Sequence, residues 1–586
     1  MNKILSLLFR PKFALCLLLA LHGSLMASFY EPACAGADAN GYLAQAQYIV
    51  NLGSSAYRAE SSLQFSGPHW RTLGDGRIIS RYPPGLPLLL SPLYWLGGPP
   101  WMLAFNPLLT TLTLAGLFAL VRLWADELWA VLAVAVMAVN PVANVWTFQS
   151  DAHPAIAFFL VWGLFFLALW SKSDKPGWIF LVGLLLGMIP ALHYAEAVFA
   201  PAIALFVLMH WKNERRFYAA FLLAILGALI PAALMGWHNC LVFGSVLITG
   251  YESSGNFSLF GWKYFFQKAL YYPLLATFAG LGPFFPLGLW GMFQMARSSE
   301  ARKEGILLLG LALPLMILYM AYFFPDPSLR FLMPTFYLYA AAAARLGMQY
   351  STRQWKYGKK IVIALMVLNT IAGLAMTILF LLPQKHMHKQ LANITSAIEE
   401  RVEADAIVIA PMIVNQYLES FGKWKLAEES YFTGKSPIPE APPSGEQGPG
   451  PGLDLEAMHS LFSFDEKAKN MEHYRNESGK GLSEVLLRDL DRWAANKHSI
   501  YWIGDKDAIL ALIPENDRAN IVCEIDIGIH PPPGAPRREP REARGADPQR
   551  RRDRGPGMVG PLGMLPGMAG GGQAAIVKWE RSQSGE

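Results

Sequence analysis

The chain has 586 residues, of which 53% are hydrophobic, 13% aromatic and only 16% charged. Soluble domains carry about 25% charged residues, so this deficit, with a mean hydropathy of +0.27, indicates a protein of the lipid bilayer. The net charge of +5 is spread over loops and the C-terminal region. This distribution excludes a basic nucleic-acid-binding module and gives no reason to expect nucleic acid as a partner.

Apolar runs of about 20 residues, the length that a membrane-spanning helix needs, recur along the first two thirds of the chain. We predict about eleven transmembrane helices. The expected spans cover residues 13–29, 102–121, 128–147, 154–170, 177–193, 195–210, 217–236, 273–296, 305–324, 330–346 and 361–382. Residues 1–28 also have the features of a signal peptide; we favour an uncleaved anchor, and residue 30 onward lies outside in either case.

The apolar stretch "PPGLPLLLSPLYWLGG" (83–98) is short and interrupted by Pro and Gly. We expect it to be interfacial or re-entrant rather than spanning. It belongs to a long first outer loop, residues 30–101.

Lys and Arg collect in every second short loop, and this bias predicts the orientation of the chain in the membrane. The basic loops, such as "KNERR" (212–216) and "ARSSEARKE" (296–304), share a side with the N-terminus. We therefore expect a cytoplasmic N-terminus in a multi-pass protein of the cell membrane, of the bacterial inner-membrane kind. An odd number of spans then puts the C-terminal region outside.

Residues 385–586 have a mixed, water-soluble composition, in contrast to the membrane module 1–384. Buried strands are predicted at 404–411 and 498–504, and an amphipathic helix at 482–496. Together they indicate a small α/β domain outside the membrane.

Two low-complexity insertions interrupt this domain, at 436–452 and 531–572, and neither can bury enough apolar surface to fold. The runs 521–529 and 574–580 flank the second insertion. We expect them to pair as two strands of a hairpin.

The four cysteines, Cys16, Cys34, Cys240 and Cys523, form no CxxC pair and no zinc spacing. A disulfide between Cys34 and Cys240 is conceivable if both lie outside, but we favour free thiols.

Unusual polar residues collect at the outer ends of the expected spans and in the outer loops. Ionisable residues at such boundaries are costly and are candidate functional residues. We expect an outward-facing pocket lined by Asp38, Arg81, Tyr82, Asp151, His153, His193, Glu196, Tyr251 and Arg330.

Several of these residues also have simpler explanations. Asp38 is suited to interact with the dipole of a helix that begins at Ala39, and Asp151 to cap a helix that begins near His153. Glu196 is suited to bond a neighbouring helix as a buried carboxyl, and Arg330 to snorkel to the membrane surface.

The two histidines have a simple explanation as well, since His153 and His193 stand singly at helix ends, where interfacial hydrogen bonds suffice to explain them. The sequence holds no Walker loop, dinucleotide fingerprint, HExxH or GxSxG in a supporting context. Energy coupling by nucleotide hydrolysis is therefore not indicated.

The order of these features resembles the GT-C superfamily of polytopic glycosyltransferases, in particular the family 39-like group of protein O-mannosyltransferases and lipid A aminoarabinose transferases. The resemblance covers about residues 1 to 385. It rests on "GADANGYLAQAQYI", "RYPPGLPLLLSPLYWLGG", "SDAHPA", "FGSVLITGYE" and "SLRFLMP", in this order and on one side. It implies an α-helical polytopic fold of the GT-C type with a C-terminal outer domain.

The resemblance also implies an activity, the transfer of a sugar from a polyprenyl-phosphate donor to a lipid, glycan or protein acceptor of the cell envelope. By analogy Asp38 is the base and Asp151 a second acid that orients the acceptor or aids the base. Arg330, and after it Arg81, is the candidate ligand of the donor phosphate. Asp38 stands alone where some members have paired acids, so an Asp-x-Asp metal site is not supported; a divalent cation as cofactor stays open.

A secondary transporter or lipid flippase is the alternative from another class, since it would also be polytopic with buried charges. Transporters commonly show repeated halves with broken helices near the midplane. The sequence shows no such internal repeat, and its polar residues gather at one face. We therefore favour the glycosyltransferase.

Overall fold

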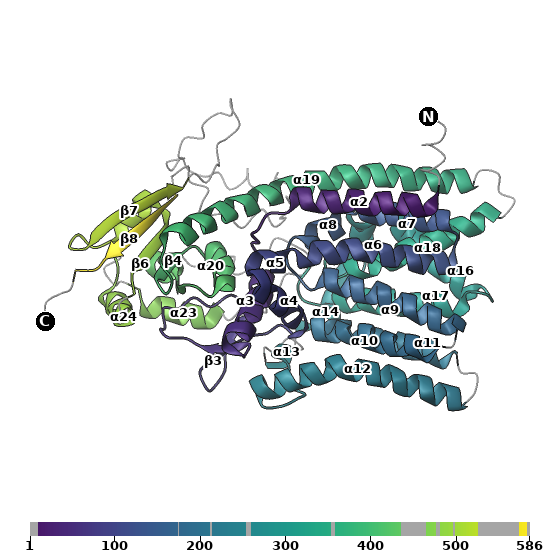
Figure 1. The fold of residues 1–586 in the computed structure, drawn as a ribbon, viewed down its shortest axis with the longest axis horizontal. Helices are drawn as coiled ribbons and strands as arrows, with labels where there is room; N and C mark the ends of the chain where they lie inside the picture. The colour runs from purple at the N-terminus through teal and green to yellow at the C-terminus, as the bar shows by residue number, and fades with distance from the viewer. Residues whose placement is uncertain are drawn as a thin grey trace, which may run out of the picture.

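A computed structural model gives the fold of the chain (Figure 1). It describes residues 10–173, 175–210, 214–253, 259–352, 358–434, 464–475, 481–495, 498–525 and 574–582. Both expected insertions, 436–452 and 531–572, lie outside the described residues.

Residues up to Arg401 are mainly helical, and most of these helices run side by side in one bundle (Figure 1). In chain order they are α2 (Pro11–Phe29), α3 (Ala37–Leu52), α4 (Gly85–Gly97), α5 (Pro99–Leu103), α6 (Phe105–Trp124), α7 (Glu127–Ala138), α8 (Pro141–Thr147), α9 (His153–Ser173), α10 (Pro176–Leu192), η1 (Tyr194–Phe199), α11 (Ala200–Leu208), α12 (Glu214–Phe243), α13 (Gly250–Ser253), α14 (Trp262–Lys268), α15 (Tyr271–Leu275), η3 (Ala276–Gly280), α16 (Phe284–Arg297), α17 (Arg302–Met320), α18 (Met333–Thr352) and α19 (Gly358–Arg401).

Among the described residues, six helices are long and apolar enough to cross a membrane, or up to eight if each of two bent helix pairs is one span. The eleven expected runs all fall on helices or on bent pairs. α4, like α10 and the η1–α11 segment, is apolar but shorter than a full span. The positions of the expected helices are thus confirmed, while the number of spans stays a prediction.

Two expected spans are not continuous. Run 128–147 bends by 58° between α7 and α8, where Asn140 caps the new helix by accepting from the Ala143 N–H at 2.9 Å and Pro141 lacks an N–H. Run 273–296 bends by 114° before α16, where Gly282 has a φ of +60°.

The first outer loop lies between the bundle and the C-terminal domain in Figure 1. It contains α3, α4 and an antiparallel sheet of β1 (Ala56–Arg58), β2 (Trp70–Thr72) and β3 (Arg77–Ser80), in the order β1-β3-β2. In this sheet Ala56 pairs with Ile79, and Trp70 pairs with Ser80. The sheet fixes residues 69–82 beside α3.

The C-terminal sheet has the strand order β5-β4-β6-β8-β7. β4 is parallel to β5 and β6, whereas β8 is antiparallel to β6 and β7. Its elements are β4 (Ile407–Ala410), α20 (Met412–Leu418), η4 (Glu419–Phe421), β5 (Lys425–Glu428), α21 (Glu429–Thr433), α23 (Phe464–His473), α24 (Glu484–Ala494), β6 (Ile500–Asp505), α25 (Lys506–Leu512), β7 (Arg518–Ile525) and β8 (Ala574–Glu580). The two predicted strands, the predicted helix and the predicted hairpin are confirmed.

Both faces of this sheet are covered, because successive residues of β4 point into different cores. Ile407 and Ile409 pack in a core with Leu486 and Leu490 of α24. Val408 belongs to the core that continues into the helical bundle. The domain is therefore joined to the bundle by packing, and α19 runs without a break through the expected boundary at 384–385.

All four cysteines, each of which the structure describes, are free thiols. Cys34 is buried and Cys240 is exposed. The preference for free thiols is confirmed.

Candidate functional site

Asp38 lies in the first turn of α3, where its carboxylate receives three side-chain donors. Tyr82 Oη and Arg330 Nη1 donate to Oδ1 and Oδ2 respectively, and His69 Nε2 lies 2.8 Å from Oδ1. Gly41 makes room for the Tyr82 ring, since a Cβ at this position would come within 2.5 Å of it. Asp38 thus has the place at the helix start that the simpler explanation requires, and it is also the centre of a polar cluster.

These donors decide the charge of Asp38. Burial alone would raise the pKa of Asp38, but Arg330, His69 and Tyr82 together hold it well below its usual range. Burial lowers the pKa of His69 to about 4, so at neutral pH this imidazole is uncharged and donates one hydrogen bond. Asp38 is therefore a carboxylate whose main counter-ion is Arg330.

Arg330 reaches Asp38 from the loop between α17 and α18. This loop is folded around the buried Asp326, whose carboxylate accepts from the backbone N–H groups of Ser328 at 3.0 Å and Phe331 at 3.4 Å. Leu329 has a φ of +60°, an uncommon conformation that such a network can hold in place. The guanidinium lies 5.0 Å from the ring centroid of Trp146, so it is fixed by charge and by an aromatic face.

Asp151 is the second carboxylate beside Arg330, with 3.9 Å between its Oδ2 and Nη1. Its Oδ1 also accepts from the His153 N–H at 3.3 Å, the contact that a helix cap makes. Burial raises the pKa of Asp151 to about 6, against the opposing effect of Arg330. Capping and a place in the site are thus combined in one residue.

A second layer continues from Asp151 into the bundle. His153 Nε2 lies 3.6 Å from Asp151 Oδ1, and the rings of His153 and His193 are 5.4 Å apart. His193 Nδ1 contacts Glu196 Oε2 at 2.6 Å, and Tyr251 Oη contacts His193 Nε2 at 2.7 Å. These four residues come from three separate segments and form one connected row.

Glu196 also accepts from Tyr319 Oη of α17 at 3.4 Å. It therefore does bond a neighbouring helix, as its simpler explanation states. Arg330 does not snorkel away from the protein, because it is held between two carboxylates.

Arg81 is buried beside this cluster. Its Nη2 lies 3.5 Å from Tyr82 Oη, and its guanidinium is 5.3 Å from the centroid of that ring. Arg81 and Tyr82, which we expected in one pocket, thus lie side by side, and Tyr82 contacts Asp38 directly.

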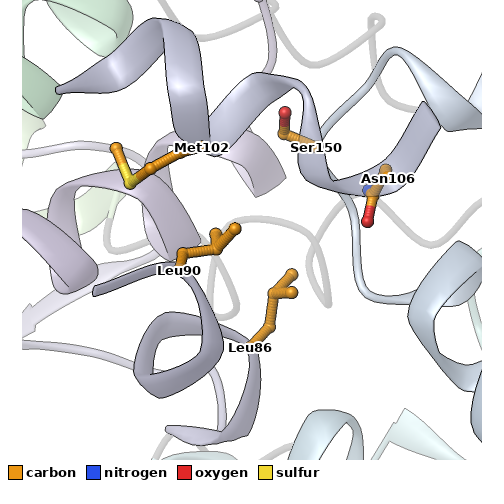
Figure 2. A pocket seen from close by; sticks show the side chains of 5 residues that line it. All are labelled: Leu86, Leu90, Met102, Asn106 and Ser150. Atoms are coloured by element: carbon orange, nitrogen blue, oxygen red, sulfur yellow. The ribbon is translucent and has the colours of Figure 1, made fainter. Parts of the chain in front are cut away.

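A narrow pocket, which has no room for a water molecule, adjoins the site (Figure 2). Its lining residues are Leu86, Leu90, Met102, Asn106 and Ser150. The amide Nδ2 of Asn106 donates to the backbone carbonyl of Asp151 at 2.8 Å. The pocket therefore has an apolar wall from α4 and α5 and a polar end next to Asp151.

Three functional candidates escaped the sequence analysis: His69, Trp146 and Asp326. His69 lies in a loop whose polar character is ordinary, and Trp146 lies in an apolar helical run. Asp326 lies in the polar stretch 323–334, of which only Arg330 was predicted as a site residue. His69 lies close to Asp38 because β2 pairs with β3. No local sequence pattern predicts this pairing.

No group of three or more His, Cys, Asp or Glu placed to hold a metal ion occurs among the described residues. Both oxygens of Asp38 are taken by side-chain donors, one of them a guanidinium. Such a set does not suit a divalent cation, which prefers oxygen ligands without a competing positive charge.

A family model described as dolichyl-phosphate-mannose-protein mannosyltransferase matches residues 83–237. The predicted resemblance is confirmed over this segment. The expected class of enzyme, a glycosyltransferase, is confirmed with it. The matched segment of this glycosyltransferase includes Asp151, His153, His193 and Glu196, whereas Asp38 and Arg330 lie outside it.

Solved structures show similarity over longer parts of the chain. ArnT from Cupriavidus metallidurans in the apo state has 12% identity and a TM-score of 0.49, and the alignment covers 87% of this chain and 95% of that one. The Archaeoglobus fulgidus oligosaccharyltransferase AglB in complex with an inhibitory peptide and a dolichol-phosphate has 14% identity, a TM-score of 0.46 and coverages of 85% and 70%.

The same archaeal protein in complex with Zn and sulfate has 13% identity, a TM-score of 0.45 and coverages of 76% and 67%. No curated protein sequence matches the chain.

Proposed function

We propose that this protein transfers a sugar from a polyprenyl-phosphate carrier to a hydroxyl group of an acceptor at the outer face of the membrane. The observation that carries the proposal is the arrangement of Asp38, Asp151 and Arg330. Two carboxylates from separate segments meet one partly buried guanidinium. The phosphate of a donor needs a cation such as this guanidinium, and the hydroxyl group of an acceptor needs a carboxylate that can take its proton.

In this proposal Arg330 binds the phosphate of the donor, because a guanidinium can bind a phosphate bidentately. The phosphate then competes with Asp38 for the guanidinium. Loosening that ion pair raises the basicity of Asp38, whose low pKa depends largely on Arg330. Donor binding thus prepares the base.

The acceptor oxygen attacks the anomeric carbon of the sugar, while the bond from this carbon to the phosphate oxygen breaks. The hydroxyl proton passes to Asp38, and the bond electrons leave with the polyprenyl phosphate, whose added negative charge Arg330 stabilises. His69 and Tyr82 hold the Asp38 carboxylate during this step. Asp151 is proposed to orient the acceptor hydroxyl or to assist the base.

Arg81, Tyr82, His153, His193, Glu196 and Tyr251 are proposed to shape the substrate site. The proposal also includes a GT-C type architecture with about eleven spans, a cytoplasmic N-terminus and a C-terminal α/β domain outside. The acceptor is a lipid, glycan or protein of the envelope.

The test uses the purified protein, a labelled polyprenyl-phosphate sugar and a panel of acceptors. Asp38→Asn should lower turnover by about 10²- to 10⁴-fold, the usual contribution of a general base. Asp75→Asn is the matched control, since Asp75 is an acid of the same outer loop that pairs with Arg77 away from the site. Retained turnover in Asp38→Asn removes Asp38 from the role of base, and a wild type inactive with every lipid-linked donor refutes the proposed function.

A further inference from the structure

Asn40, which follows Asp38 by two residues on α3, is buried between Trp70 of β2 and the C-terminal domain. Its amide Nδ2 donates to the backbone carbonyl of Gln416 at 2.9 Å and to Glu419 Oε2 at 2.5 Å. Its Oδ1 accepts from Trp70 Nε1 at 2.9 Å. The Asn40 amide therefore bonds the C-terminal domain through Nδ2 and Trp70 through Oδ1.

Trp70 connects Asn40 to the site, because the preceding residue is His69, which contacts Asp38. The loop before Trp70 fits closely over Asn40. A Cβ at Gly67 would come within 1.9 Å of Asn40 Oδ1, so only glycine fits at this position without a shift. Asn40 thus fixes the distance between α3 and the loop that carries His69.

Glu419 is the partner of Asn40 in the C-terminal domain. Its Oε1 accepts from Tyr48 Oη, one more residue of α3, at 3.0 Å. A buried carboxyl is costly to leave unsatisfied, and burial raises the pKa of Glu419 to about 7, against its hydrogen bonds with Asn40 and Tyr48. Glu419, although costly to bury, thus contacts α3 at two residues, Asn40 and Tyr48.

The domain is also held against the same loop by backbone pairing. Phe65 N–H donates to the Leu426 carbonyl at 2.8 Å, and Glu428 N–H donates to the Leu63 carbonyl at 3.0 Å. Residues 63–65 thus lie along the edge strand β5. These contacts leave the domain little freedom to slide relative to α3.

We propose that the C-terminal domain sets the position of the Asp38 carboxylate through Asn40, and that Glu419 is a positioning residue for the transfer reaction. This inference rests on the proposed function. A shift of about 1 Å in a reacting group can reduce turnover by about 100-fold. The domain therefore completes the site without touching the substrate.

The decisive variants are Glu419→Leu, which removes the side-chain acceptor of the Asn40 amide and leaves only the Gln416 carbonyl, and Glu419→Gln, which keeps an acceptor oxygen. Glu419→Leu should lower kcat about tenfold or more and leave the donor KM within about twofold, because Arg330 is untouched. Glu419→Gln should restore most of kcat. Trp70→Phe breaks the other side of Asn40 with the domain contacts intact, and should act like Glu419→Leu even if the latter folds poorly.

Tyr94→Phe is the matched control. It removes a hydrogen bond of 2.9 Å between the same two parts of the molecule, from Tyr94 Oη to the Phe421 carbonyl, without touching Asn40. It should leave turnover unchanged. The inference is overturned if Glu419→Leu and Trp70→Phe keep the wild-type kcat, if they raise only the donor KM, or if Tyr94→Phe loses as much.

Backbone hydrogen exchange separates this inference from the proposed function, because it needs no substrate. Faster exchange of residues 38–48 in Glu419→Leu but not in Tyr94→Phe supports the coupling even in a protein that transfers no sugar. Equal exchange in both variants and the wild type refutes it. A wild type without transferase activity contradicts the proposed function alone.

Discussion

The two carboxylates of the candidate site share one guanidinium but differ in basicity. Arg330 contacts Asp38 directly and lies 3.9 Å from Asp151. The pKa of Asp38 is consequently held low, whereas burial raises that of Asp151 to about 6. When the environments of two neighbouring carboxyl groups give them different pKa values, the two groups commonly have different roles in proton transfer.

Arg330→Ala should mainly weaken donor binding. A hydrogen bond to a charged group contributes about 1.5 to 3 kcal/mol, so the donor KM should rise by about 10- to 150-fold. Arg58→Ala, at an exposed arginine of the first outer loop, should leave the donor KM unchanged. Steady-state kinetics with varied donor checks this prediction, and an unchanged KM in Arg330→Ala would count against the phosphate assignment.

Transfer should also depend on pH through Asp151. If its carboxylate orients or helps to deprotonate the acceptor, it must be ionised, so kcat/KM should fall as the pH drops through about 6. Asp151→Asn should have lower activity, and its kcat/KM should not fall as the pH drops through about 6. If kcat/KM of Asp151→Asn still falls near pH 6, the titrating group is a residue other than Asp151.

The regular elements were largely predictable from the sequence, and the contacts between them were not. Apolar runs of sufficient length located the helices, and short β-branched runs located β4 and β6. The bends at Asn140–Pro141 and Gly282 depend on local backbone chemistry, which a count of apolar residues overlooks. His69 and Glu419 reach their partners only through long-range pairing, so no pattern along the chain indicates them.

The contact between η4 and α3 predicts a pH-dependent stability. Glu419 has a pKa of about 7 in the folded protein, against an ordinary value of about 4.3. Between these values the folded state binds the extra proton, so the stability falls as the pH rises toward 7 and then levels. The wild-type Tm should fall between pH 5 and 7 relative to Glu419→Gln, and parallel Tm curves would contradict this.

In the whole molecule, helix α3, whose first turn carries Asp38, lies where the helical bundle meets the C-terminal domain (Figure 1). Asp38 and His69 come from the first outer loop, Asp151 follows α8, and Arg330 precedes α18. Residues of three separate segments therefore meet at one end of the bundle. The sequence predicted this convergence from one assumption, the sidedness of the basic loops.

The sidedness of the basic loops can be tested by labelling introduced cysteines. In a variant without the four natural cysteines, Lys469→Cys should react in intact cells with a maleimide that cannot cross membranes, because Lys469 is exposed on α23 of the C-terminal domain. Arg215→Cys, at the basic start of α12, should react only after the membrane is permeabilised. Equal labelling of both positions in intact cells would remove the basis for an outward-facing site. If the sidedness were simply reversed, Arg215→Cys would react first, and the donor would have to be sought on the cytoplasmic side.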